Sequence, residues 1–209
     1  SLNGTHVNGV RHGGRRPGES PEDAAARGGT EVDLRDGDDV RVGATVIRVE
    51  SGSSVDGART VGPFRDNEPG PDNTGIFQNM NAGKLGLALD LNRPESRDVV
   101  LDLARWADVV SESFSPLAMP RWGLDYAKLA AVNPSLVMVS SCLMGQDGPL
   151  ASYAGFGTMA AAICGFHHVT GWPDLAPVGP FSAYTDYVAP RFTVAAVLAA
   201  LDHRTRTGQ

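Results

Sequence analysis

The chain has 209 residues, of which 42% are hydrophobic and 20% charged, a composition typical of a soluble globular protein with one or two domains. Its formal net charge is −6, from 18 basic and 24 acidic residues, which argues against a nucleic-acid binder. No apolar run approaches the ~20 residues needed to cross a bilayer, so we expect no membrane segment.

The ends and the cysteines suggest a piece of a reduced, intracellular protein. The chain opens with Ser1 and shows neither an initiator Met nor a signal peptide, which suggests a fragment or a processed product. Cys142 and Cys164 have no metal-ligand spacing and no partner cluster. We therefore expect buried thiols, no disulfide, no metal and a cytoplasmic location.

Residues 1–50 carry signals for turns and short strands. Asn-Gly pairs at 3–4 and 8–9 predict turns, because Asn and Gly tolerate positive φ. The alternation of Val40 and Val42, followed by Val46 and Arg48, predicts short strands. Residues 11–30 are rich in Gly, Arg, Pro, Ala and Glu without periodicity, which predicts a disordered insertion.

Two pieces of this segment resemble forkhead-associated (FHA) domains, which are β-sandwiches that bind phosphothreonine peptides. The pieces are Ser1-Leu2-Asn3-Gly4-Thr5-His6-Val7-Asn8-Gly9 and the run of residues 34–49. The resemblance implies that residues 1–50 are a partial FHA-like β segment. The phosphate-binding Arg of that family precedes the first piece and has no counterpart in this chain, so we do not expect phosphopeptide binding.

The remainder, residues 51–209, alternates between strand and helix signals after a loop rich in Gly, Pro, Asp and Asn over residues 51–79. We predict strands over residues 85–91, 108–112 and 136–141, and helices that begin at 92–96 and cover 124–132 and 158–165. The buried face of the helix that begins with Pro94 is predicted to carry Val99, Leu103, Trp106 and Ala107. Strands alternating with helices predict an open α/β sheet of Rossmann type.

The last helix is predicted to begin at Pro190, which suits the first helical position. Its bulky apolar stripe consists of Val194, Val197, Leu198 and Leu201, and Gly208 follows a basic last turn, which is a stop signal. Asp186 should then lie in a tight turn just before a helix N-terminus, where the partial positive charge stabilises a carboxylate. It can be an ordinary turn or capping aspartate, or a carboxylate placed for nucleophilic attack.

An ordered set of motifs over residues 43–209 resembles the N-terminal, nucleotide-binding half of class III (CaiB/BaiF-type, formyl-CoA transferase-like) CoA-transferases. The pieces are Gly43-Ala44-Thr45-Val46-Ile47-Arg48-Val49-Glu50, Gly62-Pro63-Phe64, Asn81-Ala82-Gly83-Lys84, Ala107-Asp108-Val109-Val110-Ser111-Glu112-Ser113-Phe114, Trp122-Gly123-Leu124-Asp125-Tyr126, Asn133-Pro134-Ser135-Leu136-Val137, Gly145-Gln146-Asp147-Gly148-Pro149 and the Asp186 region. Residues 43–50 fit both families, so we interpret them as the junction between an FHA-like piece and a partial CoA-transferase domain.

The resemblance implies an enzyme that moves CoA from an acyl-CoA donor to a small carboxylic acid. The aspartate of that family attacks the thioester, which gives a mixed anhydride and then an aspartyl-CoA thioester. Asp186 aligns with this aspartate and is the expected nucleophile, because a carboxylate is a weak base that can still form a covalent intermediate. Full-length members form interlocked homodimers, and we expect weak or no turnover from this shorter chain alone.

The expected CoA contacts follow from the same resemblance. Lys84 would meet a phosphate as a point charge, although a solvated surface lysine is an equal alternative. Phe114 would lie against the adenine or be an ordinary core residue, and Arg121 would meet a phosphate or be a surface arginine. The full set of expected CoA-binding positions is Asn81, Ala82, Gly83, Lys84, Ser113, Phe114, Ser115, Arg121, Ala154, Gly155, Phe156 and Gly157.

The sequence also bears on a racemase activity and on a metal site at the histidines. Related racemases carry a catalytic His in an Ala-Gly-His-Asp motif, where this chain has Ala154-Gly155-Phe156-Gly157. The chain therefore lacks the acid–base residue that racemase activity would require. His167 and His168 are adjacent, which makes a poor metal site, and we favour structural or pocket roles for them. The remaining alternatives are an FHA phosphothreonine-binding module and an inactive fusion or truncation product.

Overall fold

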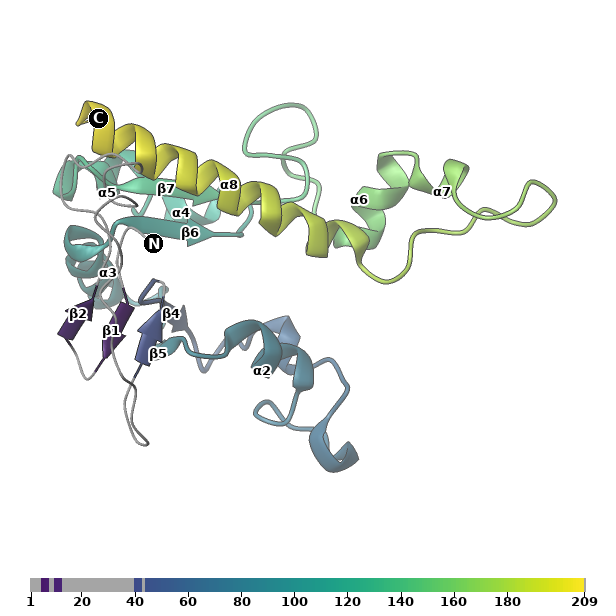
Figure 1. Ribbon diagram of the computed structural model, residues 1–209, viewed down its shortest axis with the longest axis horizontal. Coiled ribbons are helices and arrows are strands. Elements are labelled where there is room, and N and C mark those ends of the chain that lie inside the picture. The colour runs from purple at the N-terminus through teal and green to yellow at the C-terminus, as the bar shows by residue number, and fades with distance from the viewer. Residues whose placement is uncertain (1–4, 8–9, 13–39, 43, 209) are drawn as a thin grey trace. The chain divides into compact units, whose positions relative to one another are not determined.

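The computed structural model describes residues 5–7, 10–12, 40–42 and 44–208. The chain folds as two compact units, Ser1–Leu91 and Asn92–Gln209, which are considered separately below. Figure 1 shows the helices and strands of both units. Among the described residues, no helix combines the length and the apolar character that a bilayer crossing requires.

The first unit opens with a small antiparallel sheet of order β2-β1-β3, formed by β1 (Thr5–Val7), β2 (Val10–His12) and β3 (Val40–Val42). The strand predicted at Val40 and Val42 is confirmed. The predicted insertion at residues 11–30 is wrong at its first two positions, which belong to β2, and its remainder lies outside the described residues. The described strands of this segment form one three-stranded sheet, and the expected partial β-sandwich is not observed.

A parallel strand pair follows in the same unit. It consists of β4 (Ile47–Glu50) and β5 (Leu85–Ala88), in a register that pairs Val49 with Leu87. The connection holds two 3-10 turns, η1 (Gly57–Arg59) and η2 (Arg65–Asn67), and the helix α2 (Gly75–Asn81). The predicted loop over residues 51–79 is therefore wrong where α2 forms, and β5 ends three residues before the predicted end at Leu91.

The start of α2 depends on Thr74, which is fully buried. Its hydroxyl oxygen accepts a hydrogen bond from the Phe77 N–H at 3.0 Å, and the hydroxyl donates to the Ala58 carbonyl at 2.8 Å. A Thr at the N-cap satisfies an otherwise unpaired amide of the first turn. Thr74 is a typical N-cap residue, but the Gly, Pro and Asn residues around it led to the prediction of a loop.

The second unit also contains a parallel strand pair, β6 (Val109–Glu112) and β7 (Val137–Ser140), in which Val109 lies opposite Val137. Both strands were predicted. The connection between them holds α4 (Ala118–Arg121) and α5 (Tyr126–Val132), and α5 is capped by Asp125. The described residues thus form two separate two-stranded parallel sheets rather than the single open sheet that was predicted.

The helix α3 (Pro94–Trp106) begins with Pro at its first position, as predicted. Its predicted buried face is wrong in part, because Trp106 and Val99 are exposed and the buried residues are Ser96 and Ala104. α3 is in contact with α5. The side chain of Asn133 reinforces this contact by donating to two carbonyls at the end of α3, those of Ala104 and Ala107, each at 2.9 Å.

The C-terminal part consists of α6 (Gly157–Ile163), α7 (Phe166–Val169) and α8 (Tyr184–Thr207). Figure 1 shows α8 running along β7 at one end and reaching α6 at the other, and α8 is in contact with both elements. The predicted start at Pro190 is wrong, because α8 begins six residues earlier and Pro190 lies inside it. Gly208, in the left-handed conformation with φ 77°, ends the helix as predicted.

Candidate active site

Asp186 lies in the first turn of α8 rather than in the turn before it. Its carboxylate is exposed, and its backbone N–H donates to the Ala183 carbonyl at 2.9 Å. Pro190 stands four residues further on, where a helical N–H would donate to the Asp186 carbonyl. Because proline has no N–H, this carbonyl receives no regular helical hydrogen bond. Contacts outside α8 also hold this first turn.

Those contacts come from Gly157, the first residue of α6. The Gly157 N–H donates to Asp186 Oδ2 at 3.2 Å, and the Thr185 hydroxyl donates to the Gly157 carbonyl at 2.8 Å. Phe166 of α7 adds a ring contact with Tyr184, with centroids 5.3 Å apart. The early start of α8 follows from these contacts, since they stabilise a helical turn ahead of Pro190.

The structure therefore brings together two of the expected site positions, Asp186 and Gly157, which are 29 residues apart in sequence. Phe156 caps α6 and leaves 79% of its surface exposed, and Ala154 is exposed as well. Gly155 is packed so closely that an added Cβ would lie 2.8 Å from both a Leu143 methyl carbon and the Met159 sulfur. Within the segment 154–157, Gly157 is the residue shown in contact with the Asp186 carboxylate.

A second group of expected residues follows the carboxyl end of β6, the edge at which open α/β sheets bind ligands. The Phe114 N–H donates to Glu112 Oε2 at 2.7 Å, and its ring meets the Trp122 ring edge-on with centroids 5.0 Å apart. Phe114 is 44% exposed, so the core-residue alternative is wrong. Ser113 and Ser115, on either side, are exposed too.

Arg121, the last residue of α4, is exposed. Among the described residues its guanidinium forms no ion pair or hydrogen bond, whereas Arg105 and Arg206 pair with aspartates of their own helices. An arginine whose five donors are all available is suited to bind a phosphate group.

The third group, residues 81–84, connects α2 to β5 in the first unit. The Asn81 side-chain oxygen accepts hydrogen bonds from Lys84 Nζ at 2.9 Å and from Arg48 Nη1 at 3.2 Å, and its amide donates to the Phe77 carbonyl. Asn81 is therefore already satisfied by protein groups. Ala82, Gly83 and Lys84 are exposed, and Gly83 adopts a φ of 75° that favours glycine.

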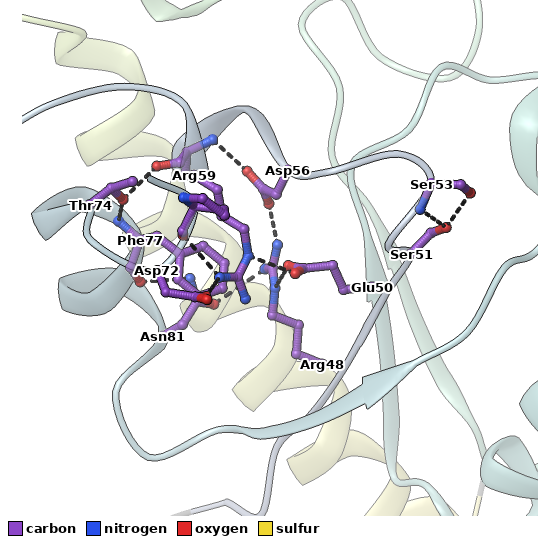
Figure 2. A network of polar contacts seen from close by, with 12 residues as sticks. Arg48, Glu50, Ser51, Ser53, Asp56, Arg59, Asp72, Thr74, Phe77 and Asn81 are labelled. Atoms are coloured by element: carbon purple, nitrogen blue, oxygen red, sulfur yellow. Dashed lines mark hydrogen bonds and ion pairs between the residues drawn. The ribbon is translucent and has the colours of Figure 1, made fainter. Parts of the chain in front are cut away.

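Asn81 belongs to a larger polar network around Phe77, which is drawn in Figure 2. Arg59 lies over the Phe77 ring, 3.5 Å from the centroid, and its Nε bonds Glu50 at 2.7 Å. Arg48 bonds the other oxygen of Glu50 at 3.0 Å and also bonds Asp56. These arginines are matched by carboxylates, so in this network Lys84 is the exposed cation.

A pocket of about 840 Å³ opens in the second unit between the β6–β7 pair and the C-terminal half of α8. Of the expected site residues it includes Ser115, while Asp186, Phe114 and Arg121 lie outside its lining. The lining residues are Glu112, Ser115, Pro116, Met119, Pro120, Asp125, Tyr126, Leu136, Val137, Met138, Ser140, Gln146, Ala199, Ala200 and His203. The pocket and the Asp186 carboxylate are therefore distinct features of α8.

The structure also tests the predictions made for the histidines and the cysteines. His167 packs against the backbone of Gly179, where an added Cβ would lie 2.5 Å from its Nε2, and this supports the structural role that was favoured. Both cysteines are free thiols, and Cys164 is exposed rather than buried as predicted. The described residues include no group of three or more His, Cys, Asp or Glu side chains that could hold a metal.

Sequence reasoning missed Thr185 as a member of the site. Its only signal was its position next to Asp186, because the Gly157 carbonyl that it bonds is 28 residues earlier. No local pattern specifies such a contact, and the predicted start at Pro190 placed Thr185 outside the helix.

Comparison with known proteins identifies the family. The model of CoA-transferase family III matches residues 40–209. The succinate–glutarate CoA-transferase of Agrobacterium fabrum and the acetyl-CoA:oxalate CoA-transferase of Acetobacter aceti are each 36% identical over 170 residues, covering 80% of this chain and 42% of the relative. The crystal structure of a CAIB/BAIF family protein from Brucella suis is similar with a TM-score of 0.72 and 36% identity, covering 80% of this chain and 44% of that protein.

The matches cover only part of each relative. The chain spans about two-fifths of the length of the curated relatives it matches. The family model begins at residue 40, so it lends no support to the FHA resemblance of the preceding residues. From residue 40 onward the chain belongs to CoA-transferase family III.

Proposed function

We propose that this chain supplies the nucleophile and part of the CoA-binding surface of an acyl-CoA:carboxylate CoA-transferase. The observation that carries the proposal is the environment of Asp186. One carboxylate oxygen is held by the Gly157 N–H, and the side chain is exposed to solvent. A nucleophilic carboxylate must be accessible and fixed in orientation, and Asp186 meets both requirements.

In the proposed reaction, a carboxylate oxygen of Asp186 attacks the thioester carbonyl of the acyl-CoA. The C–S bond breaks, the CoA thiolate leaves, and a mixed anhydride of Asp186 and the donor acid remains. The thiolate then attacks the Asp186 carbonyl, which releases the donor carboxylate and forms an aspartyl-CoA thioester. Attack by the acceptor carboxylate repeats these steps in reverse, so the new acyl-CoA leaves and Asp186 is regenerated.

We assign the CoA contacts to exposed residues in each unit. In the second unit these are Phe114, whose half-exposed ring would meet adenine, and Arg121, whose guanidinium has no ion-pair or hydrogen-bond partner among the described residues and would meet a phosphate. In the first unit Lys84 is the exposed ammonium. Ser113, Ser115 and residues 154–157 are the other proposed contacts in the second unit. In the first unit Asn81 supports Lys84 rather than contacting the nucleotide.

The names of the relatives bear on the acceptor. The names of the enzymes from Agrobacterium fabrum, Acetobacter aceti and Mus musculus pair succinate with glutarate, acetyl-CoA with oxalate, and succinyl-CoA with glutarate. The free acids in these names, succinate, glutarate and oxalate, are dicarboxylates. We therefore propose a small dicarboxylic acid as the acceptor. From the same family resemblance we propose that the complete enzyme forms an interlocked homodimer.

The test is covalent labelling of the 209-residue chain by succinyl-CoA, followed by hydroxylamine, which converts an aspartyl thioester or anhydride into a hydroxamate that mass spectrometry locates. We expect the hydroxamate on Asp186 in the wild-type chain and in Asp202→Asn, and none in Asp186→Asn. Asp202 is a matched control because it lies on the same helix and pairs only locally with Arg206. Labelling that persists in Asp186→Asn, or that is absent from a folded wild-type chain that binds CoA, would refute the proposal.

A further inference from the structure

Two consecutive residues of α8 hold Gly157 by its two polar backbone atoms. The Thr185 hydroxyl donates to the Gly157 carbonyl, and the Gly157 N–H donates to Asp186 Oδ2. Gly157 is buried, so neither of its polar groups has ready access to water as an alternative partner. The three residues therefore form a closed arrangement in which Thr185 and Asp186 share one anchor.

The two hydrogen bonds differ in quality. The Thr185 bond, at 2.8 Å, has the usual length for a hydroxyl donor, whereas the amide bond to Asp186, at 3.2 Å, is at the long limit for N–H donors. A small displacement of Gly157 away from α8 would break the longer bond first. The shorter bond limits that displacement, so the Thr185 hydroxyl controls whether the Gly157 N–H reaches the carboxylate.

The backbones are in close contact at this point. A Cβ built on Gly157 would lie 2.6 Å from both Cγ and Oδ1 of Asp186 and 2.7 Å from the Thr185 oxygen. Real Cβ atoms do not approach other atoms this closely, so the first turn of α8 rests directly on a residue without a side chain. Among the described residues Asp186 Oδ1 receives no hydrogen bond, which leaves it as the oxygen available for bonding to a substrate.

We infer that Thr185 is a positioning residue: its hydroxyl holds Gly157 so that the Gly157 N–H binds Asp186 Oδ2 and leaves Oδ1 as the attacking oxygen. The inference rests on the proposed function of Asp186 as the nucleophile. It adds a residue that touches neither the substrate nor the reacting atoms and acts only through Gly157.

The first arm of the test compares Thr185→Val, which keeps the shape and removes the hydroxyl, with Thr185→Ser, which keeps the hydroxyl. Thr193→Val is the matched control, because the Thr193 hydroxyl bonds only the Ala189 carbonyl of its own helix. We expect Thr185→Val to slow single-turnover hydroxamate formation about fivefold, because one neutral hydrogen bond contributes roughly 1 kcal/mol. The Kd for CoA should stay within about twofold of the wild-type value. Thr185→Ser and Thr193→Val should label at close to the wild-type rate.

The second arm does not depend on turnover. Because a hydrogen bond to a carboxylate moves an amide proton downfield, the NMR shift of the Gly157 amide at one fixed pH reports this bond. We expect the Thr185→Ser signal to match the wild type, and the Thr185→Val signal to move upfield as it does in Asp186→Asn. Unlabelled wild type whose Gly157 amide shows this pattern would refute the proposed chemistry alone. A Gly157 amide or a labelling rate that is unchanged in Thr185→Val would overturn the inference.

Discussion

The guanidinium of Arg204, in the last turn of α8, forms an ion pair with the Asp108 carboxylate at 2.7 Å, across 96 residues of sequence. The same guanidinium donates to the Ser135 carbonyl at 2.9 Å. Asp108 immediately precedes β6, and Ser135 lies two residues before β7. One side chain therefore fastens the C-terminal end of α8 to the amino ends of both strands.

Removal of this anchor should destabilise the second unit. We expect Arg204→Met to lower the free energy of unfolding by about 1–2 kcal/mol, because the Ser135 carbonyl and the Asp108 carboxylate both lose a donor. Asp108→Asn should cost only a few tenths of a kcal/mol, roughly what an exposed ion pair contributes. Urea unfolding followed by tryptophan fluorescence measures this directly, since all three tryptophans (Trp106, Trp122 and Trp172) lie in the second unit.

The control for that experiment is Arg206→Met. Arg206 pairs with Asp202 along the helix surface and is 72% exposed, so its removal should change stability by less than about 0.5 kcal/mol. Equal losses in the Arg204 and Arg206 variants would contradict the anchoring role of Arg204.

A side chain at Gly157 should disrupt the site. Gly157→Ala would place a methyl group 2.6 Å from the Asp186 carboxylate, which forces α6 and α8 apart and costs about 1–3 kcal/mol of stability. Covalent labelling should fall more than in Thr185→Val, because both hydrogen bonds are lost together. Thr158→Ala, at the next position and exposed, is the control, and full labelling of Gly157→Ala would show that the close contact is unimportant.

Arg121 should contribute to CoA affinity through its charge. We expect Arg121→Met to weaken CoA binding about tenfold by isothermal titration calorimetry and to reduce the salt dependence of the affinity, as loss of a charge-assisted phosphate contact would. Arg105→Met removes an exposed arginine that is already paired with Asp102, and it should bind CoA normally. A similar loss in both variants would indicate a general charge effect rather than a contact.

Thr74 should be required for the helix α2. We expect Thr74→Val to destabilise the first unit by about 2–3 kcal/mol, since the Ala58 carbonyl and the Phe77 amide both lose a partner at a fully buried position. Because the first unit has no tryptophan, native-state hydrogen exchange of the α2 amides is the appropriate measurement. Thr74→Ser should restore protection, and the exposed Thr60→Val should not reduce it.

The alternating strands and helices could be predicted from the sequence because their signals are local. Both β6 and β7 form where hydrophobic, β-branched runs occur, and α3 begins at its predicted Pro94. The buried face of α3 could not be predicted by periodicity alone, because the small Ser96 and Ala104 are buried while the larger Val99 and Trp106 are exposed. Apolar periodicity gives no weight to small or polar residues such as these.

The candidate site was predicted as a set of positions but not as a geometry. Asp186, Phe114 and Arg121 were chosen from motifs, and their exposure fits the proposed roles. The start of α8 was predicted six residues too late, at Pro190. Contacts with α6 and α7, which lie far away in the sequence, stabilise a helical turn ahead of this proline. Asn81 was expected to contact the nucleotide. Only the structure reveals that its side-chain oxygen already accepts hydrogen bonds from Arg48 and Lys84.

The helix α8 carries Asp186 near its first residue and Arg204 near its last, so a movement at one end displaces the other. Asp186 and Arg204 are separated by 18 residues, and at ~1.5 Å per residue this places the carboxylate about 27 Å along the helix from its anchor. A tilt of about 2° at the anchor would displace the carboxylate by about 1 Å, a shift large enough to slow a reaction roughly 100-fold. The position of the Asp186 carboxylate therefore depends on how rigidly Arg204 holds the opposite end of α8.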